Sequence, residues 1–133
     1  MQAGTRTFLA VGLGGALGTG ARVGLSLAAL AQIPEHAFLA TLLANILGAA
    51  LIGYLSTRAL SVRAKGFWMT GFCGGFTTFS LFSLELLTLV EKSPTVALAY
   101  GSGSLALWVL AVWGGVRFGC WKSARSGSPP PRP

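Results

Sequence analysis

The sequence has few charged residues and hardly any acidic ones, and these shortages argue against a soluble domain. Only 10% of the 133 residues are charged, whereas soluble domains carry roughly 25%. Asp is absent, and the acidic residues are Glu35, Glu85 and Glu91. With 53% hydrophobic residues and a formal net charge of +7, the composition is typical of a basic membrane protein.

Histidine and cysteine are also scarce, which removes most catalytic and metal-binding arrangements. His36 is the one histidine, and we expect it to be solvated in a polar linker. No Ser/His/Asp set, metal-ligand cluster or phosphate-binding loop occurs among the motifs. Cys73 and Cys120 fall at different expected membrane depths, so we expect no disulfide between them. We therefore expect a protein that is not an enzyme.

Four apolar runs are each long enough to cross a bilayer. They cover about residues 8–30, 37–57, 67–90 and 95–116, and a hydrocarbon core needs about 20 apolar residues of helix. We predict an all-α membrane protein with four transmembrane helices in one domain, residues 1–121. Residues 122–133 are basic and proline-rich, and we expect a disordered tail there.

The positive charges fall on one side of this topology. If both termini are cytoplasmic, one Lys lies outside, Lys92, and eight cations lie inside: Arg6, Arg58, Arg63, Lys65, Arg117, Lys122, Arg125 and Arg132. By the positive-inside rule, we expect cytoplasmic termini in a cell inner membrane. We expect no nucleic-acid binding, because no soluble basic face exists to present these charges.

Polar side chains inside the spans are candidate functional residues, because burying them in lipid is costly. Thr41 and Asn45 lie one helical turn apart in the second span, as do Tyr100 and Ser104 in the fourth. Two such stripes of donors would suit an anion that sheds its water. The other interpretation of Asn45 is that its amide holds two helices together.

The first span combines glycines with a cation. Gly14 and Gly18 are four residues apart, a spacing that favours close packing of two helices. Arg22 lies well inside the same span. Its guanidinium either reaches the membrane interface or serves an anion in a wet vestibule, and both interpretations stay open.

The third span contains a stretch that forms a poor helix. Residues 71–83 hold three glycines, two threonines and four phenylalanines, so we predict a break in mid-membrane. Phe79 and Phe82 are three residues apart and could turn electropositive ring edges toward an anion. Periodicity alone favours core packing for them. Glu85 follows about one turn later, either protonated or paired with hydroxyls.

These segments resemble the Fluc (CrcB) family of fluoride channels. The resemblance rests on the glycine-rich run that ends at Arg22, on Thr41-x-x-x-Asn45-x-x-Gly48, and on Gly-Gly-x-Thr-Thr-Phe-Ser within residues 71–83. It extends over all four spans, residues 8–116. The second and third signatures together are highly specific, whereas the first alone is weak.

The resemblance implies a four-helix subunit of an antiparallel, dual-topology dimer with two pores that export fluoride passively. The implied pore residues are Asn45, Phe79, Phe82, Thr41 and Ser104, with Tyr100 and Glu85 beside them and Arg22 in a vestibule. It also implies a structural Na⁺ at the dimer centre, held by the backbone carbonyls of Gly74 and Thr77.

Two features depart from the family pattern. Trp108 stands one turn beyond Ser104, where some members have a further Ser. The eight-to-one charge bias does not suit a homodimer whose subunits insert in both directions. The expected partner is therefore either a second copy of the chain or, by the charge bias, an oppositely oriented paralogue.

Two other classes of membrane protein compete with a fluoride channel. A small multidrug-resistance transporter also has four short helices. That class has an essential Glu in its first span, where this chain has Arg22. A scaffold without transport activity would use the glycines and Asn45 for packing alone. Fluoride efflux from liposomes, with chloride as a control, separates the three.

Overall fold

The computed structural model describes residues 2–33 and 38–125, which are almost entirely helical. The helices are α1 (Gln2–Gln32), α2 (Phe38–Ser56), α3 (Val62–Lys65), the π-helix η2 (Gly66–Cys73), α4 (Gly74–Phe76), α5 (Phe79–Lys92) and α6 (Pro94–Arg125). Four stretches are long and apolar enough to cross a membrane: Gly4–Gln32, Phe38–Ser56, Val62–Lys92 and Pro94–Arg125. The all-α, four-span prediction is confirmed. The linker that contains His36 lies outside the described residues.

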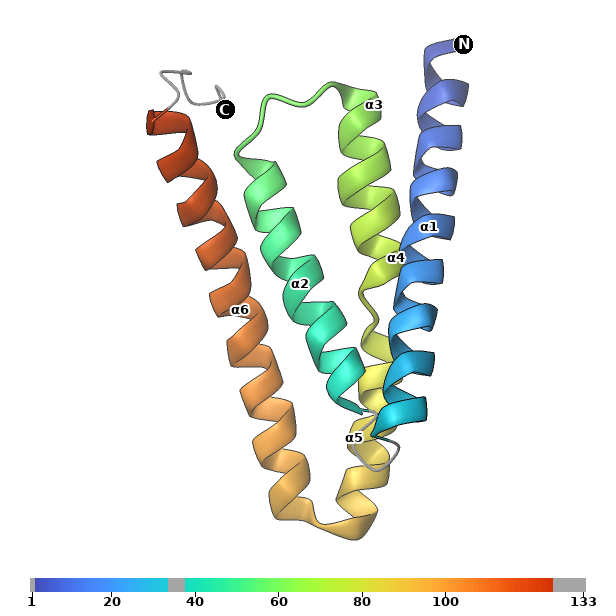
Figure 1. Cartoon of the computed structure of the whole chain (residues 1–133), viewed down its shortest axis with the longest axis vertical. Coiled ribbons are helices and arrows are strands. Elements are labelled where there is room, and N and C mark those ends of the chain that lie inside the picture. Colours follow the sequence, from blue (N-terminus) through green and yellow to red (C-terminus); the bar gives the residue numbers. More distant parts are fainter. Residues whose placement is uncertain (1, 34–37, 126–133) are drawn as a thin grey trace.

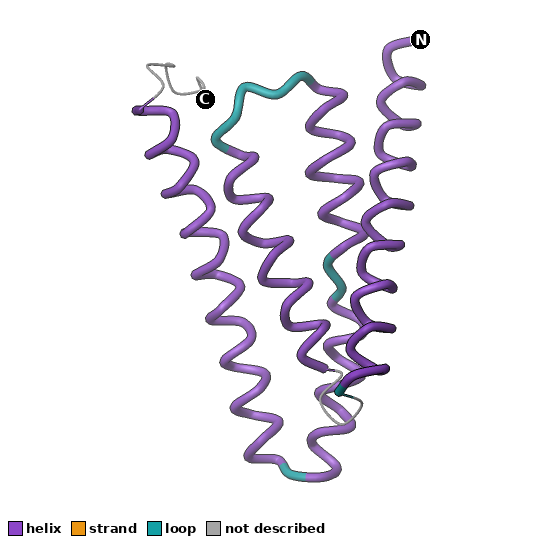
Figure 2. Tube along the Cα trace, viewed as in Figure 1, coloured by secondary structure: helices purple, strands orange, loops and turns teal. Residues whose placement is uncertain are grey.

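The four spans run alternately up and down (Figure 1). The start of α1, the α2–α3 connection and the end of α6 lie at one end, and the short α5–α6 turn lies at the other (Figures 1 and 2). Lys92 closes α5 at the turn end. The cations of the described chain that belong to the opposite end are Arg6, Arg58, Arg63, Lys65, Arg117, Lys122 and Arg125. Most of the cations in the described chain therefore lie at the end of the bundle opposite the α5–α6 turn.

Close backbone packing joins α1 to the first half of the third span. A Cβ added at Gly14 or Gly18 would collide with the backbone of Phe67 or Phe72. On the other side, a Cβ at Gly71 or Gly75 would collide with carbonyls of α1. The helices approach this closely because both contact faces lack side chains. The packing role predicted for Gly14 and Gly18 is confirmed.

Helix α6 packs along α2 and is longer than its predicted span. Gly53 of α2 and Gly115 of α6 each face a backbone carbonyl of the other helix. The helix continues to Arg125, so residues 122–125 are helical although we expected them in the disordered tail. Lys122 and Arg125 occupy the last turn, where positive charge interacts favourably with the negative end of the helix dipole. The Arg125 guanidinium also lies 4.8 Å from the Trp121 ring centre. The expected disorder of residues 126–133 concerns a segment outside the described residues.

The third span breaks in mid-course, as the sequence predicts. Thr77 and Thr78 are both extended, with ψ of 155° and 124°, and they separate α4 from α5. The Thr78 hydroxyl then accepts a hydrogen bond from the Leu81 N–H at 3.3 Å, which caps the new helix. The π-helix η2 before the break was not predicted from the sequence.

Candidate functional site

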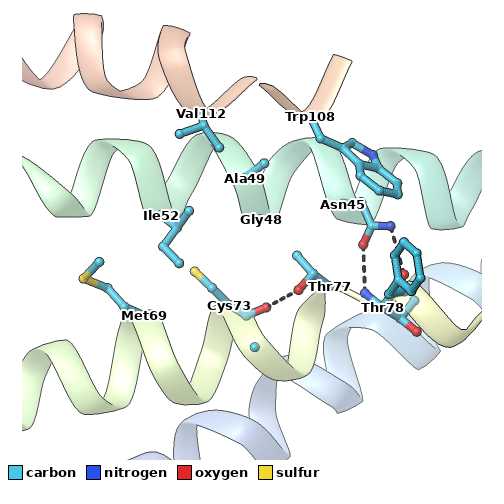
Figure 3. Close-up of a pocket in the computed structure, with 12 residues that line it drawn as sticks. Asn45, Gly48, Ala49, Ile52, Met69, Cys73, Thr77, Thr78, Trp108 and Val112 are labelled. Carbon is cyan, nitrogen blue, oxygen red and sulfur yellow. Dashed lines mark hydrogen bonds between the residues drawn. The ribbon is translucent and has the colours of Figure 1, made fainter. Parts of the chain in front are cut away.

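Asn45 of α2 binds the backbone at the break. The Thr78 N–H donates to Asn45 Oδ1 at 2.8 Å, and Asn45 Nδ2 donates to the Thr78 carbonyl at 3.0 Å (Figure 3). The buried amide therefore supplies the acceptor that the Thr78 N–H would have in a continuous helix, and it adds a donor to the Thr78 carbonyl. Within the described chain, the second Nδ2 hydrogen of Asn45 has no partner. Asn45 does hold two spans together, and it keeps one donor for another group.

A second set of hydrogen bonds joins three spans at Glu85. The Thr41 hydroxyl of α2 donates to Glu85 Oε1 at 2.5 Å, and the Tyr100 hydroxyl of α6 donates to Oε2 at 2.9 Å. Thr41 is only 2% exposed. The prediction that Glu85 pairs with hydroxyls is confirmed, and both of its oxygens are occupied.

The two phenylalanines after the break lie in different environments. Phe82 is 3% exposed, and its ring centre lies 5.4 Å from Tyr100 and 4.8 Å from Trp108. Phe79 is 67% exposed, although its ring centre lies only 5.7 Å from Phe82. Phe82 therefore packs in the core beside the polar stripes, whereas Phe79 is largely exposed and lines the pocket beside the break.

The polar stripe of α6 ends in two buried donors. Ser104 is 2% exposed, and neither its hydroxyl nor the buried Trp108 indole nitrogen has a hydrogen-bond partner in the described part of the chain. The two residues lie one helical turn apart on α6. Sequence reasoning selected Ser104 but treated Trp108 only as a departure from the family. The signal for Trp108 was its spacing, since it continues the series Tyr100, Ser104.

A pocket of about 330 Å³ opens beside the break. Asn45, Thr78 and Trp108 line it together with residues of η2 and α4 (Figure 3). Its walls come from α2, the third span and α6, so it joins the break to the two donor stripes. Gly74 and Thr77, the predicted Na⁺ ligands, also line it.

Arg22 contacts the break from the α1 side. Its Nε donates to the Gly75 carbonyl at 3.3 Å, and the Thr19 hydroxyl donates to the same oxygen at 3.4 Å. Arg22 is half-buried. This hydrogen bond satisfies a carbonyl near the end of α4, so part of the guanidinium serves the break rather than the membrane interface.

The Gly74 carbonyl loses its helical donor at the break. In an α-helix this oxygen would accept the Thr78 N–H, but that N–H donates to Asn45. Gly74 is exposed, and nothing lies within 4 Å of the position that a Cβ would take. In the described chain no three His, Cys, Asp or Glu side chains gather as a metal site. Backbone carbonyls are therefore the ligands that this region offers to a hard cation.

The predicted site residues thus form one buried cluster with two outliers. The cluster gathers residues of α2, α5 and α6: Thr41, Asn45, Phe82, Glu85, Tyr100 and Ser104. Phe79 is exposed at the rim of the pocket, and Arg22 binds Gly75 from α1. A membrane-buried row of donors beside aromatic rings can strip and replace the hydration shell of a small anion.

Comparisons with known proteins show the family of the chain. Residues 9–116 match the family model described as "CrcB-like protein, Camphor Resistance (CrcB)". A relative from Stutzerimonas stutzeri, named fluoride-specific ion channel FluC, is 42% identical over 117 residues, which cover 84% of this chain and 94% of the relative. A relative of the same name from Paracoccus denitrificans is 43% identical over 119 residues, which cover 85% and 94%. This chain therefore belongs to the CrcB family.

Proposed function

We propose that this chain is a subunit of a fluoride-selective channel, through which fluoride leaves the cytoplasm passively across the inner membrane. The observation that carries the proposal is the row of buried donors on α2 and α6 beside Phe82. Membership of the CrcB family and the names of the relatives support fluoride as the ion. Conduction breaks no covalent bond, so the protein is not an enzyme.

Donors that change partners would let fluoride pass without being trapped. Fluoride is small and strongly hydrated, so the pore must replace its water stepwise and still release the ion. The hydroxyls of Thr41 and Tyr100 bind Glu85, and a hydroxyl rotates easily to a new acceptor. Each can turn from the carboxylate to a passing ion and back. The free hydrogen of Asn45 and the ring edges of Phe79 and Phe82 add weaker contacts.

A second, antiparallel chain would complete the pore. Phe79 and Gly74 are both exposed in the single chain, although the resemblance places one in the pore and the other at the dimer centre. A partner that packs on this face would cover both residues. Because the cations gather at one end of the bundle, we propose cytoplasmic termini and a partner that is an oppositely oriented paralogue, rather than a second copy.

Na⁺ fits the carbonyls at the break. Gly74, which is exposed, and Thr77 both line the pocket beside the break and carry backbone oxygens. Two oxygens from one chain are fewer than a hard cation usually takes, so both chains would contribute. Bound there, Na⁺ would supply the positive charge that stabilises carbonyls left without helical donors. We expect replacement of Na⁺ by N-methylglucamine to lower the thermal stability of the assembled protein. An unchanged melting temperature would contradict a structural Na⁺.

Fluoride efflux from liposomes tests the channel proposal. The protein, purified from its native membranes with any chain that accompanies it, is reconstituted, and a fluoride electrode follows release against a chloride control. We expect fluoride efflux without chloride efflux. Drug transport driven by a proton gradient would favour the multidrug transporter, and the absence of any flux would favour the scaffold.

Phe82→Ile is the variant that connects this flux to the site. Phe82 borders the donor row, and isoleucine keeps an apolar group but has no ring edge. We expect this variant to assemble and to lose fluoride efflux, whereas Phe118→Ile, at an exposed position on α6, conducts normally. Full flux through Phe82→Ile would remove Phe82 from the pore.

A further inference from the structure

The indole N–H of Trp108 is a buried donor that nothing in this chain satisfies. Its Nε1 atom is shielded from solvent and has no partner in the described residues. A buried N–H without an acceptor is costly, about 1–3 kcal/mol, so such a group in a folded protein calls for a ligand. The Ser104 hydroxyl, one turn away on the same helix, is buried and unpartnered as well.

The surroundings of Trp108 connect it to the break. The indole extends from α6 toward Asn45 and Thr78 and lines the same pocket (Figure 3). On its other side, the ring centre lies 4.8 Å from that of Phe82, in an edge-on arrangement of 69°. Trp108 therefore lies between the pocket that Asn45 lines and the ring of Phe82, one helical turn from the unpartnered Ser104 hydroxyl.

The chemistry of these groups selects an acceptor that needs no donor in return. An indole N–H can only donate, and aromatic ring edges carry positive charge. The atoms are sealed from bulk water, so an ion that reaches them has shed most of its hydration. A small bare anion fits these conditions better than water, which must also donate its own hydrogens.

We propose that the Trp108 indole N–H and the Ser104 hydroxyl together form a binding position for dehydrated fluoride. This inference rests on the proposed channel function and adds a nitrogen donor to the hydroxyl row. In a chain with Trp at this position, the row continues past Ser104 with a rigid N–H in place of a rotating hydroxyl. The ion then passes Phe82 between the Glu85 network and Trp108.

Two substitutions at this position separate the donor from the ring. Trp108→Phe keeps an aromatic ring against Phe82 but has no N–H, whereas Trp108→Ser keeps a donor but has no ring. We expect fluoride efflux to fall about tenfold in Trp108→Phe, because a hydrogen bond to a charged group is lost, and to fall less in Trp108→Ser. The matched control is Trp113→Phe, at an exposed position on α6, which should conduct normally. The opposite order of the two variants, or normal flux in Trp108→Phe, would assign Trp108 to packing and overturn the inference.

Binding is measured separately on the wild-type assembly with ¹⁵N-indole tryptophan. This chain contributes four indole signals, from Trp68, Trp108, Trp113 and Trp121. The signal that is missing in Trp108→Phe belongs to Trp108. We expect fluoride to shift this signal saturably and chloride to leave it in place. An unmoved signal in a preparation that conducts fluoride overturns this inference alone. A wild-type preparation that conducts no fluoride overturns the channel proposal instead.

Discussion

At the residue scale, the buried polar groups differ in what they bind. Asn45 holds the Thr78 backbone, and Thr41 and Tyr100 hold Glu85. The Ser104 hydroxyl has no partner in the described chain. The Asn45 amide fixes the shape of the break, whereas the hydroxyls of Thr41, Tyr100 and Ser104 can exchange partners. A substitution therefore tests structure or conduction, according to the group that it removes.

Asn45→Asp should damage both the break and the passage of fluoride. A carboxylate still accepts the Thr78 N–H but cannot donate to the Thr78 carbonyl, and its negative charge repels an anion. We expect loss of fluoride efflux and a free energy of unfolding lower by about 1–3 kcal/mol, measured by electrode and by denaturation in detergent. Gln32→Glu, the same change at the exposed end of α1, should alter neither. Normal efflux in Asn45→Asp would exclude Asn45 from the pore.

Thr41→Val and Tyr100→Phe each remove one donor from Glu85. Each change keeps the shape of the side chain but leaves a carboxylate oxygen unpaired, so we expect slower efflux and a loss of about 1–3 kcal/mol in stability. Because both hydroxyls bind one carboxylate, the two losses should not add in the double variant. Thr88→Val removes an exposed hydroxyl that bonds only within α5 and serves as the control. Strict additivity would contradict a shared network.

The sequence predicted which polar residues are buried together better than what they bind. Helical spacing alone pairs Thr41 with Asn45 and Tyr100 with Ser104. The partner of Asn45 depends on the rotation of α2 relative to the break, which no local pattern specifies. For the same reason, the spacing of Phe79 and Phe82 did not reveal that Phe79 is exposed and Phe82 buried.

At the element scale, the third span combines features that the sequence does and does not specify. The break follows from glycines and β-branched residues, so composition predicts it. The π-helix η2 (Gly66–Cys73) has no comparable signal. It lies against α1, where Gly14 and Gly71 bring the two backbones together, a contact between spans that no local pattern specifies.

Gly18→Ala should push α1 away from the third span. The new methyl group would collide with the Phe72 carbonyl, which belongs to a helix backbone and cannot rotate aside. We expect a loss of about 1–3 kcal/mol in stability, measured by unfolding in detergent, as is usual for overpacking. Gly12→Ala, where nothing lies within 4 Å of the added Cβ, provides the comparison. Equal stability of the two variants would contradict close packing at Gly18.

At the scale of the whole molecule, the charge distribution predicts one orientation in the membrane. Lys92 lies alone at the turn end, whereas the other end carries the α2–α3 cations Arg58, Arg63 and Lys65 and the cations near both termini. We expect tags on both termini to be inaccessible from outside intact cells when the chain is expressed alone. Moving the three α2–α3 cations to the α5–α6 turn should make part of the population accessible. Equal labelling from both sides in the unaltered chain would contradict the single orientation and favour a homodimer.

The bond between Asn45 and Thr78 also predicts an order of assembly. Before α2 docks, the Thr78 N–H has no acceptor in lipid other than its own helix, so a newly inserted third span must remain continuous through Thr77 and Thr78. We expect the helix to open only when the Asn45 amide arrives to accept the Thr78 N–H. We therefore expect the break to form late, during helix association and after insertion.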